Sequence, residues 1–143
     1  MTDPIHILYV EDNVGDVHLM KEALAELRLR MCVHHVNNGE AALDFIARRA
    51  AYTAAPEVQA IVLDLNLPRT SGLEVLRELA AYPRATVPPI VVLTTAAREQ
   101  DVRSAAADLP FRFLTKPLDF NEFLEMVTII ERYAREASSQ PPA

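Results

Sequence analysis

The chain has 143 residues, half of them hydrophobic, which suits one compact domain with its own core and is too short for two ordinary domains. A net charge of −6, with Lys and Arg scattered along the chain, opposes non-specific binding to nucleic acid. No stretch approaches the roughly twenty apolar residues of a membrane span, and the N-terminus lacks the pattern of a signal peptide, so we expect a cytoplasmic protein.

Five short apolar runs, rich in β-branched residues, predict strands. The lone Cys32 excludes an internal disulfide, and its place inside the second run predicts burial. The second run also carries His34 and His35, which as neighbours on a strand would point to opposite faces and would not bind one metal together. The runs cover residues 5–10, 31–36, 60–63, 90–93 and 111–114.

A segment of helical period follows each of these runs, and a loop is expected over residues 49–57. Alternation of strand and helix predicts right-handed crossovers and a parallel sheet with helices on both faces, an α/β doubly wound fold. The apolar faces are expected at Val17, Met20, Leu24 and Leu27, at Ala42, Phe45 and Ile46, at Leu73, Leu76 and Ala80, at Val102, Ala105 and Ala106, and at Phe120, Phe123, Leu124, Val127 and Ile130.

Polar side chains follow four of the five runs. Glu11 and Asp12 come after the first, Asp64 after the third, Thr94 after the fourth, and Lys116 closely after the fifth. In an open parallel sheet the carboxyl ends of the strands lie along one edge, where ligands bind. We therefore expect three carboxylates, a hydroxyl and an ammonium to meet there.

Each of these residues also has a simpler explanation on its own: Asp12 as a helix cap, Asp64 as a turn residue, and Lys116 as an exposed side chain. Together they are harder to explain in this way, because clustered carboxylates repel one another unless a cation compensates them. Mg²⁺ prefers oxygen ligands, uses one or two protein carboxylates and completes its shell with water and phosphate oxygens. The cluster therefore predicts a magnesium site.

Asp64 is the best candidate for a nucleophile among the three carboxylates. Aspartate side chains form aspartyl phosphates, and phosphoryl transfer needs mainly positioning and neutralisation of charge. Mg²⁺ and Lys116 would supply both, and the Thr94 hydroxyl could donate a hydrogen bond to another phosphoryl oxygen.

These residues, taken with their neighbours, resemble the receiver domain of bacterial two-component response regulators. The resemblance extends from about residue 5 to about residue 133 and implies the flavodoxin-like strand order 2-1-3-4-5. The motifs that carry it are Ile7-Leu-Tyr-Val-Glu-Asp12, Val62-Leu-Asp-Leu-Asn-Leu-Pro68, Val91-Val-Leu-Thr94 and Thr115-Lys-Pro117.

The resemblance assigns roles to individual positions. It implies that Asp64 accepts the phosphoryl group, that Glu11 and Asp12 bind the metal with Asp64, and that Asn66 adds its backbone carbonyl. It makes Thr94 and Phe113 a switch pair, which changes the surface formed by the fourth helix, fifth strand and fifth helix. It makes Lys116-Pro117 a candidate for a cis peptide bond.

A narrower resemblance is to the small stand-alone regulators paired with phytochrome-type histidine kinases. It implies a histidine on such a sensor kinase as phosphodonor, and a homodimer through the face of the fourth and fifth helices. We expect a receiver domain over residues 1–137, a disordered tail over residues 138–143 and no output domain.

Three other functions remain open from the sequence. A pseudo-receiver would bind partners without phosphorylation, but the complete set of expected site residues argues against it. A hydrolase with an Asp nucleophile would need a cap or substrate pocket, and no insertion looks long enough. A flavin-binding module is less favoured, because the carboxylates would repel the phosphate of the cofactor.

Overall fold

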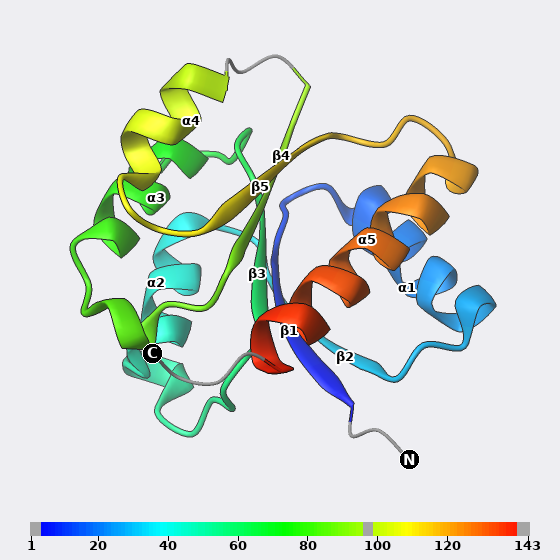
Figure 1. The fold of residues 1–143 in the computed structure, drawn as a ribbon, viewed down its shortest axis with the longest axis horizontal. Helices are drawn as coiled ribbons and strands as arrows, with labels where there is room; N and C mark the ends of the chain where they lie inside the picture. Colours follow the sequence, from blue (N-terminus) through cyan, green and yellow to red (C-terminus); the bar gives the residue numbers. More distant parts are fainter. Residues whose placement is uncertain (1–3, 96–98, 140–143) are drawn as a thin grey trace.

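The computed structural model describes residues 4–95 and 99–139, and it forms one parallel sheet between two layers of helices (Figure 1). The strand order is β2-β1-β3-β4-β5, which confirms both the predicted fold class and the order implied by the receiver resemblance. The strands are β1 Ile5–Val10, β2 Met31–Val36, β3 Ala60–Asp64, β4 Ile90–Thr94 and β5 Phe111–Thr115; the helices are α1 Val14–Leu27, α2 Gly39–Ala47, α3 Gly72–Ala80, α4 Glu99–Ala106 and α5 Phe120–Ser139.

The two faces of the sheet bury separate apolar clusters. Helices α1 and α5 cover one face, and α2, α3 and α4 cover the other (Figure 1). Strands β3 and β4 lie in the interior of the sheet and are buried along their whole length, as their continuous apolar runs predict. No helix within the two described ranges is long and apolar enough to cross a lipid bilayer.

The helices begin where short polar side chains cap them. The side-chain oxygens of Asn13, Asn38 and Ser71 accept hydrogen bonds from backbone N–H groups in the first turns of α1, α2 and α3. Asn13 therefore caps the first helix, and the alternative that Asp12 does so is wrong. This leaves the carboxylate of Asp12 available at the sheet edge.

Several local expectations were wrong. Cys32 is exposed, because β2 is an edge strand whose residues are only partly covered. The expected loop over residues 49–57 contains a short 3₁₀ helix, Ala50–Tyr52. Helix α5 continues to Ser139, two residues into the expected tail, and residues 140–143 lie outside the described chain. In α3 the predicted Leu76 is buried, whereas the predicted Leu73 and Ala80 are only partly buried and Val75 and Leu79 complete the buried face.

Gly72 brings the start of α3 against the end of β3. Its N–H donates to the carbonyl of Leu65 at 3.2 Å. A Cβ at position 72 would lie 2.6 Å from the Leu65 Cα and 2.9 Å from the carbonyl oxygen of Asp64. The close approach therefore fixes the backbone that carries Asp64.

We expect Gly72→Ala to lower the free energy of unfolding by about 1–3 kcal/mol, because a methyl group would press on backbone that cannot move aside cheaply. Urea unfolding measures this. Gly15→Ala is the matched control, since its Cβ would meet only the Asn13 side-chain oxygen, at 3.1 Å, and should cost far less. Equal stability of the two variants would contradict the constraint.

Candidate functional site

Three site residues lie at or just after the ends of three strands, and their side chains point to the same face of the sheet. Side chains alternate along a strand, so Glu11 follows Tyr9, Asp64 follows Val62, and Lys116 follows Leu114 on the face covered by α1 and α5. The parallel register places the ends of β1, β3, β4 and β5 along one edge. The contacts of Lys116 with Glu11 and Asp64 show that these three side chains meet at that edge, as the sequence analysis expected of them.

Three carboxylates meet at this edge. One oxygen from each of Glu11, Asp12 and Asp64 lies within 4.8 Å of the others. Glu11 and Asp64 are fully buried, whereas Asp12 is exposed at the mouth of the site. Hard oxygen donors of this number and charge fit a divalent cation, which would relieve their mutual repulsion.

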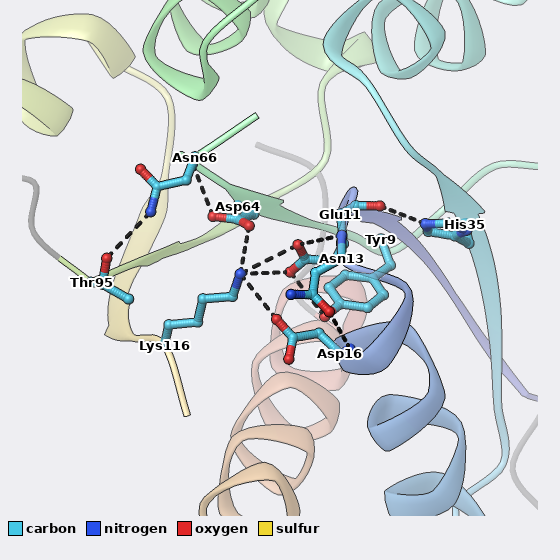
Figure 2. Close-up of polar contacts among 9 residues, drawn as sticks. All are labelled: Tyr9, Glu11, Asn13, Asp16, His35, Asp64, Asn66, Thr95 and Lys116. Atoms are coloured by element: carbon cyan, nitrogen blue, oxygen red, sulfur yellow. Dashed lines mark hydrogen bonds and ion pairs between the residues drawn. The ribbon is translucent and has the colours of Figure 1, made fainter. Parts of the chain in front are cut away.

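Lys116 provides the positive charge of the site (Figure 2). Its Nζ lies 2.7 Å from Asp64 Oδ2, 3.1 Å from Glu11 Oε1 and 3.1 Å from Asp16 Oδ2. The lysine side chain is only 15% exposed, so these interactions act with little screening by water. The ammonium thus compensates part of the negative charge of the carboxylate cluster.

The two oxygens of Asp64 have different partners. Oδ1 accepts a hydrogen bond from the Asn66 N–H at 2.9 Å, and Oδ2 accepts one from Lys116. The Asn66 side-chain amide donates to the Thr95 hydroxyl at 3.3 Å, which links the loop after β3 to the end of β4 (Figure 2). The carboxylate is therefore held in one orientation before any reaction.

Glu11 is held by groups that the sequence did not identify as part of the site. Its Oε2 accepts from the Asn13 N–H at 3.2 Å, and the buried Tyr9 hydroxyl lies 3.4 Å from Oε1. His35 Nε2 lies 2.6 Å from the Glu11 carbonyl oxygen, so this nitrogen carries the proton and donates. His34 points away from His35 toward Phe45, as expected for neighbours on a strand.

Burial and crowding of charge change the protonation of the site. Burial, the hydrogen bond with Asp64 and the charge of Asp64 raise the pKa of Glu11 to about 8. Burial alone would lower the pKa of Lys116, but hydrogen bonds to Asp64 and Asp16 and nearby carboxylate charges raise it above its usual value. The lysine therefore stays charged, while Glu11 holds a proton near neutral pH when no metal is bound.

Asp16 is the site residue that the sequence analysis missed. It lies in the first turn of α1, and its carboxylate contacts Lys116 directly. The spacing in the sequence pointed to this position. Asp16 comes four residues after Asp12, in the first turn of a predicted helix, and an acidic side chain there lies near the edge of the sheet that carries Asp12.

The expected switch residues lie on the other face of the sheet. Thr94 is the last residue of β4 and is buried, and its carbonyl accepts from the Lys116 N–H at 3.0 Å. Phe113 is partly buried and packs against the cluster covered by α2, α3 and α4. Strand alternation places both side chains on that face, where Phe113 lies opposite Val92 and Thr94 lies two positions further along β4.

The expectation of a cis bond between Lys116 and Pro117 is wrong for this structure, since the described residues contain no cis peptide bond. The trans form is the commoner state of a bond before proline, favoured by about 0.5–1 kcal/mol. Lys116 reaches the carboxylates with this bond in trans.

Comparison with known proteins shows one family. A family model described as response regulator receiver domain matches residues 7–128, from inside β1 to inside α5. Response regulator Rcp1 of Synechocystis sp. (strain ATCC 27184 / PCC 6803 / Kazusa) is 34% identical over 140 residues, which cover 98% of this chain and 95% of Rcp1. The match therefore includes every element that carries a site residue.

Solved structures agree with this match. The Mn²⁺-bound form of Rcp1 has a TM-score of 0.77 at 34% identity, covering 98% of this chain and 100% of that one. The phosphorylated cyanobacterial phytochrome response regulator RcpA has a TM-score of 0.80 at 32% identity, covering 98% and 99%. The bacteriophytochrome response regulator AtBRR has a TM-score of 0.69 at 31% identity, covering 99% and 97%.

The raised pKa of Glu11 gives a prediction about pH. Between about 4.5, its ordinary value, and about 8, the folded metal-free protein holds a proton that the unfolded chain has released. The free energy of unfolding should therefore fall as pH rises across this interval and level off above it. Mg²⁺ affinity should rise over the same interval, because the cation displaces the proton.

Urea unfolding in chelator and Mg²⁺ titration, each from pH 5 to pH 9, measure the two slopes. Glu11→Gln cannot release this proton, so the variant should lack this part of both slopes. Slopes that are the same in wild type and variant would show that Glu11 titrates normally.

Lys116→Met should destabilise the metal-free protein by about 3 kcal/mol, because it leaves the buried carboxylate of Asp64 without its cation. Mg²⁺ should then stabilise the variant more than the wild type. Thermal unfolding with and without Mg²⁺ tests this, with Lys21→Met as control, since Lys21 is the other lysine of the chain and is exposed on α1. Equal stabilisation of both variants by Mg²⁺ would contradict this role of Lys116.

Proposed function

Because the chain belongs to the response regulator receiver family, a family of phosphoacceptor signalling domains, we propose that Asp64 accepts a phosphoryl group from a histidine kinase. The observation that carries the proposal is the fully buried Asp64 carboxylate, placed between a cluster of cation-binding oxygens and the ammonium of Lys116 at 2.7 Å. An aspartate in this setting meets the two needs of phosphoryl transfer, positioning and charge neutralisation.

In the proposed reaction a carboxylate oxygen of Asp64 attacks the phosphorus of a phosphohistidine. The new bond joins oxygen to phosphorus, the phosphorus–nitrogen bond breaks, and the donor imidazole keeps the electron pair and takes up a proton. Mg²⁺, when bound, supplies positive charge to the phosphoryl oxygens. Glu11, Asp12, Asp64 and the Asn66 carbonyl would hold it, and Lys116 would pair with another phosphoryl oxygen.

The response would pass through Thr94 and Phe113. A phosphoryl group at the sheet edge would attract the hydroxyl of Thr94, and this would leave space on the face where Phe113 packs. Movement of the aromatic ring would change the surface of α4, β5 and α5. A changed surface of this kind alters affinity for protein partners, and we propose that a homodimer forms through this face.

The proposed phosphodonor is a phytochrome-type sensor kinase in the cytoplasm. The printed names of RcpA and AtBRR link those two proteins to phytochromes, and both resemble this chain over nearly its whole length. Val14 and Leu118 are 81% and 86% exposed. They lie two residues after Asp12 and Lys116 in the chain, and their exposed apolar side chains could contact a protein phosphodonor.

Asp64→Asn should abolish phosphorylation and keep the fold, because the amide has the same shape but is not a nucleophile. Intact-mass spectrometry after incubation with acetyl phosphate and Mg²⁺ should show one phosphoryl adduct on the wild type, and no adduct should form when a chelator is present during the incubation. Asp108→Asn is the control, an exposed aspartate before β5 at the opposite edge of the sheet. A wild-type level of adduct on Asp64→Asn would overturn the assignment.

A further inference from the structure

We propose that Asp16 is a positioning residue. It holds the ammonium of Lys116 in place while Glu11 and Asp64, the other two carboxylates that contact this ammonium, bind the cation and the phosphoryl group. The inference rests on the proposed function, since it concerns how Lys116 serves Asp64. Asp16 does not touch the reacting atoms in this arrangement, and it would act only through the lysine.

The geometry places Asp16 firmly. Its backbone N–H donates to the side-chain oxygen of the helix cap Asn13 at 3.0 Å, which fixes the first turn of α1. From there Asp16 Oδ2 reaches Lys116 Nζ at 3.1 Å, with the two side chains 20% and 15% exposed. Figure 2 shows Asp16 approaching the ammonium from the α1 side, while Asp64 lies on the other side.

The number of donors on the ammonium explains why a third carboxylate matters. A lysine ammonium has three N–H donors, and here Asp64, Glu11 and Asp16 each lie within 2.7 to 3.1 Å of it. A cation would take up Glu11 and Asp64, and a phosphoryl oxygen would replace Asp64 as the partner of the lysine. Asp16 would then be the one of the three carboxylates that stays with Lys116 alone.

Without Asp16 the lysine would lose its remaining anchor. A largely buried ammonium with an unpaired donor is costly, so Lys116 would move toward solvent. This movement takes it out of the position from which it meets the incoming phosphoryl group. Phosphorylation of Asp64 should then become slower, with the cation site itself little changed.

A simpler electrostatic view predicts the opposite sign. Asp16 adds a negative charge close to a site that must accept an anionic phosphoryl donor. If that repulsion were its main effect, removal of the charge would accelerate phosphorylation. The direction of the change therefore separates positioning from repulsion.

The test compares Asp16→Ala and Asp16→Asn with the wild type. The rate of adduct formation is measured with acetyl phosphate at saturating Mg²⁺, and the Mg²⁺ Kd is measured separately. We expect Asp16→Ala to be slower by roughly tenfold and Asp16→Asn to lie between it and the wild type, because the amide oxygen still accepts a hydrogen bond but carries no charge. The Mg²⁺ Kd should change by less than about threefold.

Glu26→Ala is the matched control, since it removes one acidic residue from an exposed position on the same helix. It should phosphorylate at the wild-type rate. Asp16→Ala as fast as the wild type or faster would overturn the proposal, and so would equal slowing in Glu26→Ala.

A second measurement does not depend on phosphorylation. The ¹⁵N NMR signal of the Lys116 ammonium is recorded at saturating Mg²⁺, so that the cation takes up Glu11 and Asp64. It should be visible in the wild type and in Glu26→Ala, because the ordered group exchanges its protons slowly. The signal should broaden or vanish in Asp16→Ala, and an unchanged signal would also overturn the proposal. If no variant and no wild type forms an adduct, the proposed function fails, while this signal still decides the role of Asp16.

Discussion

The structure depends on the balance of charge around two buried carboxylates. Glu11 and Asp64 lie with no exposed surface at the carboxyl edge of the sheet, where burial makes each negative charge expensive. Lys116 offsets part of that cost, and a proton on Glu11 offsets more of it in the absence of metal. Binding of a divalent cation would therefore displace the proton of Glu11. Lys116 would remain charged and could pair with the phosphoryl group of the proposed reaction.

The fold holds the charged side chains of the site in fixed positions. Parallel strands bring Glu11, Asp64 and Lys116 to one edge and one face, although 105 residues separate the first from the last. The contact of Gly72 with the backbone of Leu65 secures the loop after Asp64. Asp12 remains exposed at the mouth of the site, next to the buried Glu11.

Much of the fold and of the site could be predicted from the sequence, because strands and helices each have a distinct spacing of apolar residues. Apolar runs separated by helical segments gave the class of fold, and polar residues directly after the runs gave the cluster and Lys116. The order of the strands came from the family resemblance alone. The spacing of Asp16 from Asp12 pointed to its place near the site, but the contact with Lys116 was seen only in the structure. The exposure of Cys32 depends on which strand lies at the edge of the sheet, and the local pattern of residues does not show this.

Identification of the phosphorylated residue would test the account most directly. The protein would be treated with acetyl phosphate and Mg²⁺, reduced with borohydride, which converts an aspartyl phosphate to homoserine, and digested for peptide mapping by mass spectrometry. The account predicts homoserine at position 64 alone, and none when a chelator is present. Homoserine at position 12 or 16 instead, or phosphate that resists borohydride and remains on another side chain, would contradict it.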